Sequence, residues 1–176
     1  MLYRAEILSL LKQRSIPYEL TEHPAIVNME EAAQAALPYP EDEAKNLFVR
    51  DDKKRAYYLI TVRGDRQIDL KWFRTRYGTR PLSFANDAAL AHYLGLQPGS
   101  VTPLGLLNNT EHSVILFLDD SFLEGAGRIG VHPNDNTATL WLKTADLIRL
   151  LQEYGTDVRT VNLRQDTESA ATDPRA

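Results

Sequence analysis

The 176-residue chain contains no cysteine. This absence excludes a cysteine nucleophile, a CxxC redox pair and a thiolate zinc site, and it agrees with a reducing compartment. No stretch reaches the roughly 18 apolar residues of a membrane-spanning helix, and the N-terminal segment carries Glu6 where a signal peptide has an apolar run. We therefore expect a cytoplasmic protein with no membrane partner.

Signature motifs of several enzyme classes are missing as well. The sequence has no GxSxG, HExxH or GxxxxGK[ST] motif. The stretch 125–130 fits GxGxxG, but His132-Pro133 follows where a dinucleotide site needs a helix, so we expect no such site. Because the histidines have no paired spacing, the sequence predicts neither a metal centre nor a bound cofactor.

The composition is that of one folded domain, with 43% hydrophobic and 25% charged residues. Residues 1–164 show no internal linker or repeat, and we expect 165–176 to be a flexible C-terminal tail. Helical and strand patterns mix without regular alternation, which favours an α+β fold with a mixed, largely antiparallel sheet flanked by helices. Helices are expected over 2–14, 29–37, 68–77, 88–94 and 144–154, and strands over 18–21, 47–49, 56–62, 82–84, 113–118, 137–142 and 158–163.

Residue types that cap helices occur at several of these ends. Asn28 precedes Glu31 at the capping-box spacing, Asn86 and Asp87 are candidate N-caps, and Thr144 is expected to cap the last helix. Pro38 and Pro40 stop the second helix, and Gly95 and Gly155 stop two later ones.

Charge is distributed unevenly along the chain. The whole chain has a net charge of -4, yet the segment 45–80 carries eleven basic and four acidic residues, while the remainder carries nine basic and twenty acidic ones. Such polarity suits a protein that meets a phosphate backbone with one face. A hairpin with solvated lysine and arginine side chains is the alternative.

Three groups of polar residues stand beside turns or strand starts. Lys45 and Asn46 precede an apolar strand, where a functional ammonium and amide or a solvated lysine are both open readings. The turn Gly99, Ser100, Val101, Thr102 and Pro103 offers N–H groups and hydroxyls for a carbonyl or ribose, or it is a plain surface turn. His132 lies at a stiff bend, either in a site or simply hydrogen-bonded.

Five blocks in order carry a resemblance to a known family. They are 45–51, 57–59, 82–85, 98–106 and 130–134, and together they resemble the YbaK/prolyl-tRNA synthetase editing-domain superfamily over about residues 1–164. The chain looks most like the free-standing branch that deacylates mischarged tRNA(Pro), in particular the alanyl-tRNA(Pro) deacylases.

The resemblance implies an enzyme, an aminoacyl-tRNA deacylase, and assigns roles to the polar groups. It implies that Lys45 is the residue most tied to activity, that the loop from Gly99 to Pro103 lines the aminoacyl pocket with Asn46 beside it, and that His132 lies at the same cavity. The expected partners are the acceptor stem and 3′ end of tRNA(Pro), with prolyl-tRNA synthetase as a further candidate.

An aminoacyl ester is already activated, so its hydrolysis needs a positioned water and charge stabilisation more than a protein nucleophile. We expect Lys45 to anchor the terminal adenosine, the 99–103 main chain to hold the carbonyl, and the neighbouring ribose hydroxyl to assist the water. His132 is expected to shape the pocket rather than to act as a base. A cavity too small for proline would spare the correct product, and the helix at 29–37 with Met29 is either its movable wall or a simple packed helix.

Other functions remain open. The same fold could act on cysteinyl, seryl or threonyl esters, because pocket volume and one hydroxyl decide between them. It could also be a tRNA- or synthetase-binding module without activity, or an esterase that needs no tRNA.

Overall fold

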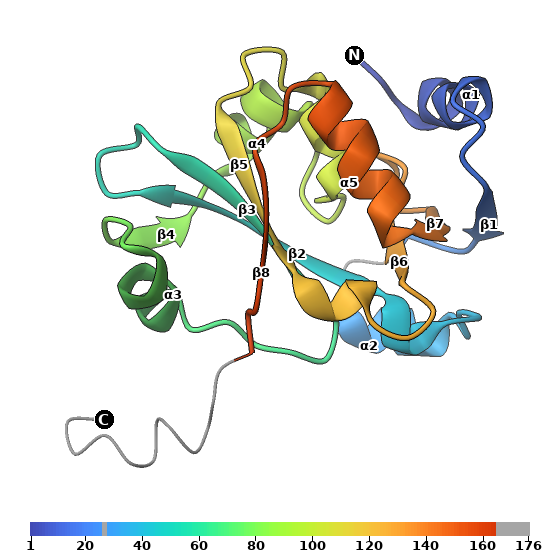
Figure 1. The fold of residues 1–176 in the computed structure, drawn as a ribbon, viewed down its shortest axis with the longest axis horizontal. Helices are drawn as coiled ribbons and strands as arrows, with labels where there is room; N and C mark the ends of the chain where they lie inside the picture. Colours follow the sequence, from blue (N-terminus) through green and yellow to red (C-terminus); the bar gives the residue numbers. More distant parts are fainter. Residues whose placement is uncertain (26–27, 165–176) are drawn as a thin grey trace.

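The computed structural model describes residues 1–25 and 28–164, so the expected tail at 165–176 lies outside the described residues. Within these described residues, eight strands form two sheets (Figure 1). The larger sheet has the order β4 (Leu82–Phe84), β2 (Ala44–Asp51), β3 (Tyr57–Arg63), β5 (Val114–Asp119) and β8 (Val158–Val161). The smaller sheet has the order β1 (Tyr18–Glu22), β7 (Ala138–Lys143) and β6 (Arg128–Val131).

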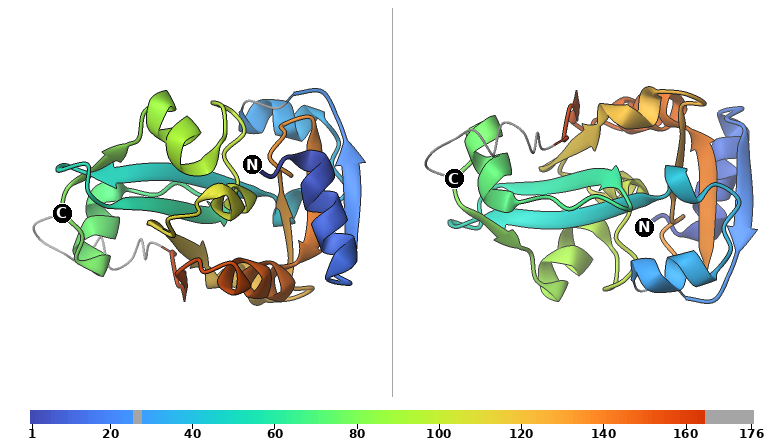
Figure 2. Two further views of the ribbon diagram at one scale, coloured as in Figure 1. Left: turned by 90° about the horizontal axis from the view of Figure 1, so that it is seen from above. Right: turned by 90° about the horizontal axis from the view of Figure 1, so that it is seen from below.

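Helices accompany both sheets, as Figure 2 shows from above and below. They are α1 (Arg4–Gln13), α2 (Met29–Gln34), α3 (Leu70–Tyr77), α4 (Asp87–Leu94) and α5 (Thr144–Glu153), with 3₁₀ turns at Pro40–Asp42, Pro103–Asn108 and Asp120–Leu123. No described helix is long and apolar enough to cross a membrane. The α+β fold class is confirmed.

Pairing within the sheets differs in part from the expected pattern. β2 pairs antiparallel with β3 and with β4, whereas β3–β5 and β5–β8 are parallel. The smaller sheet is antiparallel throughout. The strand pairing is therefore mixed and largely antiparallel, as expected. The strands form two sheets instead of one, and the sequence pattern within a single strand does not reveal this division.

Most predicted helix ends are present. The Asn28 side chain accepts a hydrogen bond from the Glu31 N–H at 2.8 Å, and Asn86 accepts one from the Ala89 N–H at 2.8 Å. Gly95 ends α4 with a φ of +66°, a left-handed conformation that glycine adopts without strain. The cap predicted at Thr144 is wrong, because its hydroxyl donates instead to the Phe122 carbonyl at 2.8 Å.

One strand was not predicted. β6 begins within the glycine-rich stretch 125–130, where the sequence indicated only turns, and ends at Val131. Gly130 sits within this strand opposite Trp141, and a Cβ there would come within 2.2 Å of the indole ring. The glycine is present because the tryptophan lies across the strand.

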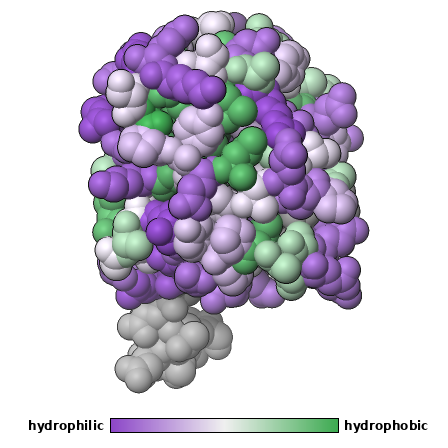
Figure 3. Space-filling model, turned by 90° about the vertical axis from the view of Figure 1, so that its right-hand side faces the viewer, coloured by the Kyte–Doolittle hydropathy of each residue, from purple (hydrophilic) through white to green (hydrophobic). Residues whose placement is uncertain are grey.

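The two faces of the larger sheet carry separate cores. The larger core fills the space towards α1, α4, α5 and the smaller sheet, and the smaller core, with Phe73 of α3, covers the opposite face. Figure 3 views the end of the molecule that carries α1 and β1, where small apolar areas alternate with polar side chains. The hairpin of β2 and β3 and the edge strand β4 lie at the other end (Figure 1).

Candidate functional site

Lys45 and Asn46 lie at the start of β2 and point to opposite faces of the sheet. Neighbouring residues of a strand alternate in direction, and β2 pairs with β3 without interruption from Ala44 to Arg50. Asn46 therefore shares its face with Phe48 of the larger core, and Lys45 shares its face with Val49 of the smaller core. Two residues adjacent in the chain can thus reach a ligand from two sides.

The same part of β2 is an unpaired sheet edge. β4 pairs only with Val49–Asp51, and β6 meets β2 only through the bridge from Glu43 to Gly130. Because the Asp51 N–H donates to the Ala56 carbonyl, the alternation of the ladder turns the N–H and C=O of Asn46 away from β3. Within the described ranges no strand pairs with the main chain of Asn46, so a ligand lying along this edge would meet it.

The Asn46 side chain holds the predicted loop against the sheet. Its amide donates to the Val101 carbonyl at 3.3 Å, and its Oδ1 accepts a hydrogen bond from the Thr61 hydroxyl at 2.6 Å. Because the Thr61 hydroxyl donates to Oδ1, the NH₂ group of Asn46 is turned towards the loop, where it donates to Val101. The amide therefore determines where the loop lies relative to the unpaired edge of β2.

The loop itself is joined to the turn that carries His132. The Thr102 hydroxyl donates to the His132 carbonyl at 2.7 Å and accepts a hydrogen bond from the Leu104 N–H. Thr102 and Pro103 are buried, Gly99 has a φ of +86°, and the Ser100 N–H donates to the Gln97 carbonyl. The structure thus brings Asn46, the 99–103 loop and His132 together.

The His132 imidazole is held in one tautomer. Its Nδ1 lies 2.9 Å from the Ala138 carbonyl, which can only accept, so Nδ1 carries the proton and Nε2 has a free lone pair. Burial lowers the pKa of His132 below its ordinary value, and the neighbouring His23 acts in the same direction, while the hydrogen bond to Ala138 opposes them. The ring is therefore neutral at neutral pH.

Lys45 lies on the other side of the edge. Its Nζ is 3.5 Å from the Arg66 carbonyl, a long hydrogen bond, and its side chain is half-buried. Among the ion pairs of the described residues none includes Lys45. Its ammonium group is therefore not neutralised by a carboxylate in this part of the chain.

A cavity of about 470 Å³ lies on the Lys45 side. It is lined by Glu43, which shares the face of Lys45, by the turn Gly64 and Asp65, and by the chain at and after the end of α2. Ala33, Ala36 and Leu37 form that last part of the lining. Of these three residues only Ala33 belongs to α2, so the helix borders this cavity at its C-terminal end. The side chain of Met29 lies outside the described part.

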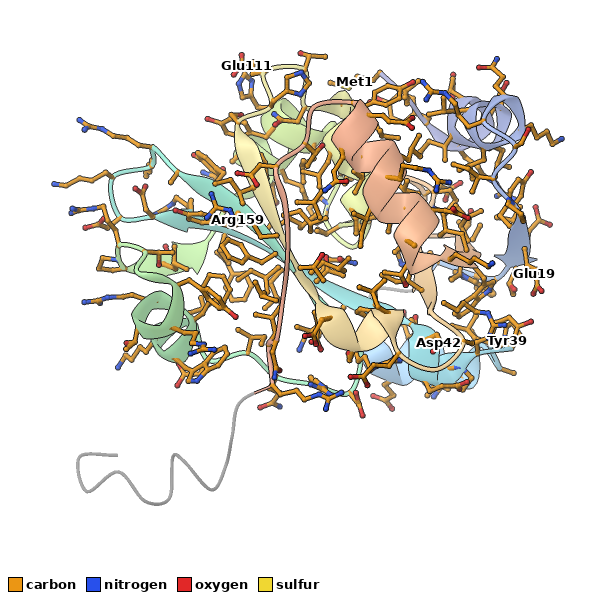
Figure 4. All side chains as sticks on the ribbon, in the orientation of Figure 1. Met1, Glu19, Tyr39, Asp42, Glu111 and Arg159 are labelled. Atoms are coloured by element: carbon orange, nitrogen blue, oxygen red, sulfur yellow. The ribbon has the colours of Figure 1, made fainter. Side chains whose placement is uncertain are left out.

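Several contacts fix the segment that follows α2 in the chain. Figure 4 shows Tyr39 beside Glu19, and the Tyr39 hydroxyl donates to this carboxylate at 2.9 Å. The guanidinium of Arg128 lies 3.7 Å from the centre of the Tyr39 ring, and Asp42 accepts hydrogen bonds from Arg63 and Arg128. These contacts tie the chain after α2 to β1, β3 and β6.

Sequence analysis missed two partners of the site. The His23 ring lies 6.1 Å from the His132 ring, and its Nε2 is 2.8 Å from the Thr139 hydroxyl. Thr61 is the other, since it orients Asn46. No spacing rule could have found either, because both lie far from their partners in the chain. Within residues 1–25 and 28–164, no three metal-binding side chains of the His, Cys, Asp or Glu type cluster.

Comparison with known proteins identifies the family. The family described as the aminoacyl-tRNA editing domain matches residues 23–150, a range that includes Lys45, Asn46, the 99–103 loop and His132. The chain belongs to the aminoacyl-tRNA editing family. The predicted enzyme class, an aminoacyl-tRNA deacylase, is thereby confirmed.

Individual relatives and a solved structure are similar to most of the chain. The chain is 35% identical over 157 residues to the prolyl-tRNA editing protein ProX of Acetoanaerobium sticklandii, covering 89% of this chain and 95% of that protein. It is 34% identical to the prolyl-tRNA synthetase associated domain-containing protein 1 of Bos taurus, over 90% and 96% of the two chains. A crystal structure of a candidate trans-editing enzyme for prolyl tRNA synthetase has the same fold, with a TM-score of 0.67 at 23% identity over 91% and 95% of the chains.

Proposed function

We propose that this editing domain acts in trans on mischarged tRNA(Pro) and removes alanine from it. The single observation that carries the proposal is the unpaired edge of β2, where Lys45 and Asn46 face a ligand from opposite sides. The names of the ProX and synthetase-associated relatives support tRNA(Pro) as the carrier, with prolyl-tRNA synthetase as a further partner.

Lys45 anchors the terminal adenosine in this proposal. An ammonium group without a carboxylate partner among the described residues is suited to a phosphate or ribose oxygen. The Lys45 side chain is half-buried, and its hydrogen bond to the Arg66 carbonyl is long. A phosphate oxygen can therefore replace this carbonyl as the acceptor at small cost. Lys45 thereby positions the ester at the edge without taking part in bond making.

The opposite side of the edge holds the reacting ester. The main-chain groups of Asn46 and of the 99–103 loop bind the aminoacyl group, while Thr102 and Pro103 give the loop its shape. Water attacks the carbonyl carbon with help from the neighbouring ribose hydroxyl, and the ester oxygen leaves the carbonyl carbon and takes up a proton. The products are the free amino acid and a tRNA with an intact 3′ end.

His132 forms part of the pocket wall. Its Nδ1 proton is held by the Ala138 carbonyl, and its neutral ring adds no charge to the site. Nε2 can accept a hydrogen bond from the substrate.

Selectivity rests on size. A synthetase pocket built for proline discriminates against a smaller side chain by only about 1–3 kcal/mol, so alanine is charged by error. A pocket too small for the pyrrolidine ring excludes prolyl-tRNA(Pro), the correct product, by steric clash. In this proposal the 99–103 loop and His132 set the volume of the aminoacyl pocket, because the cavity next to α2 lies on the Lys45 side of the edge.

The test is hydrolysis of tRNA(Pro) carrying alanine, proline, serine, cysteine or threonine. We expect alanyl-tRNA(Pro) to be deacylated and prolyl-tRNA(Pro) to remain intact. Equal or faster loss of the seryl, cysteinyl or threonyl ester would overturn the alanine assignment.

A Lys45→Ala variant separates an enzyme from a binding module. We expect at least a 100-fold loss of the rate on alanyl-tRNA(Pro) with an unchanged melting temperature, because Lys45 has no structural ion pair among the described residues. Lys12→Ala, at an exposed lysine of α1, is the matched control and should keep full activity. An unchanged rate in Lys45→Ala would place the chemistry elsewhere.

A further inference from the structure

Phe84 is an exposed aromatic residue to which the proposed function assigns no role. Its side chain is 62% exposed at the end of the edge strand β4. A single exposed apolar side chain is ordinary on a protein surface. What distinguishes Phe84 is its position relative to Lys45.

Phe84 and Lys45 lie on the same face of the sheet. Phe84 pairs directly with Val49, and directly paired residues of antiparallel strands share a face. Lys45 and Val49 lie four positions apart in β2, so they share this face too. Along the strand the separation between Lys45 and Val49 is about 13 Å at 3.3 Å for each residue.

Exposed basic side chains occur on the elements that neighbour this aromatic residue. α3 lies against β4 (Figure 1), and its exposed residues include Lys71, Arg74 and Arg76. The hairpin turn beyond β2 adds exposed Lys53 and Arg55. An aromatic ring among cations is the combination that proteins use for single-stranded nucleic acid, where bases stack on the ring and cations meet the phosphates.

We propose that Phe84 stacks on an unpaired base of the tRNA 3′ end, upstream of the terminal adenosine that Lys45 holds. The inference rests on the proposed function for the identity of the RNA. The separation of about 13 Å lies within the reach of a short single strand, and the unpaired edge of β2 lies between the two contacts. Stacking is tolerant of sequence, so this subsite orients the 3′ end towards the site without selecting a base.

The test compares Phe84→Ala, Phe84→Trp and the wild-type protein. Binding of a short RNA oligonucleotide ending in CCA is measured by fluorescence anisotropy, together with KM and kcat on alanyl-tRNA(Pro). We expect Phe84→Ala to weaken oligonucleotide binding and raise KM about 5- to 150-fold, the range expected for loss of one stacked base. Phe84→Trp should retain binding, because the indole ring also stacks.

Leu123→Ala is the matched control. Leu123 is an apolar side chain that is 45% exposed on the 3₁₀ turn Asp120–Leu123, and its loss should change neither KM nor binding. Hydrolysis of 3′-alanyl-adenosine, which has no upstream base, should be equal in Phe84→Ala and the wild-type protein.

Three results would overturn the stacking proposal. The first is unchanged oligonucleotide binding in Phe84→Ala, and the second is an equal loss of hydrolysis rate on alanyl-tRNA(Pro) and on 3′-alanyl-adenosine. The third is a defect of Phe84→Ala that is confined to binding of prolyl-tRNA synthetase. Failure of the proposed function is recognised separately, as wild-type protein that binds the oligonucleotide but releases no alanine from tRNA.

Discussion

At the scale of single residues, His132 shows how burial adjusts a side chain to its surroundings. In the proposed function, a protonated imidazole would place a positive charge in the pocket that accepts the ammonium group of the aminoacyl ester. Burial lowers the pKa of His132, so folding favours the neutral ring, and the Ala138 carbonyl fixes its proton on Nδ1. The surroundings of the residue therefore keep the pocket wall uncharged.

This environment predicts the pH dependence of deacylation. Because the pKa of His132 in the folded protein lies below the ordinary value of about 6.5, the enzymatic rate should stay level between pH 7.5 and 6.5. It should fall only at lower pH, by up to about tenfold for each pH unit, as the ring becomes charged. Rates on alanyl-tRNA(Pro), corrected for spontaneous hydrolysis, measure this profile.

A His132→Asn variant is the control for the profile. It keeps a hydrogen-bonding side chain but has no titrating ring, so the decrease below pH 6.5 should be absent. A decrease of the wild-type rate that begins at or above pH 6.5, or one retained in His132→Asn, would contradict the assignment.

At the scale of elements, the smaller sheet depends on one close contact between β6 and β7. Gly130 lies opposite Trp141, and the indole ring occupies the space of a side chain at position 130. The Trp141 Nε1–H donates to the Thr21 hydroxyl of β1 at 3.0 Å, so the ring also joins the third strand. Because β6 leads directly to His132, this packing helps to position the site.

Gly130→Ala should therefore destabilise the protein. A Cβ at 2.2 Å from the ring forces the tryptophan or the strand to move, at a cost of roughly 1–3 kcal/mol. Chemical denaturation measures this loss in the free energy of unfolding. In a Trp141→Leu background the same alanine should cost much less, since the ring is gone. Equal losses of unfolding free energy in the two backgrounds would show that the clash with Trp141 does not cause the destabilisation.

At the scale of the whole molecule, the elements of one segment carry a positive charge on an acidic protein. The segment 45–80 contains β3, α3 and most of β2, with a local balance of +7 against -11 elsewhere. The eight residues of β2 span about 26 Å from the site to the hairpin turn. An acceptor stem along this side would meet basic residues while the rest of the surface repels it.

Salt should therefore weaken the interaction with tRNA. We expect log KM on alanyl-tRNA(Pro) to rise linearly with log salt concentration, because binding releases counterions from the phosphates. A Lys53→Gln/Arg55→Gln double variant should raise KM at low salt and reduce this slope by up to about 2, with kcat unchanged. A Lys12→Gln/Arg149→Gln double variant, at exposed positions of α1 and α5, removes the same charge and should keep the wild-type slope. An unchanged slope in the double variant would exclude the hairpin turn from the interface.

Much of the local structure could be read from neighbouring residues. β4 has the predicted bounds, and the caps at Asn28 and Asn86 are present, because the relevant hydrogen bonds join residues three apart. β6 was missed because a strand of four residues with a central glycine has no periodic signal. Thr144 was misread because its hydroxyl bonds to Phe122, far away in the chain.

For the site, the sequence by itself determined which chemical groups are available and that no protein nucleophile is needed to cleave an activated ester. Lys45, Asn46, the 99–103 loop and His132 are recognisable as a set of blocks in order. Only the tertiary structure decided that Lys45 and Asn46 face opposite sides of an unpaired edge, and that His23 approaches His132. The reason is physical: a strand fixes the direction of its own side chains, but its neighbours in the sheet and the packing of distant segments decide which of them meet a ligand.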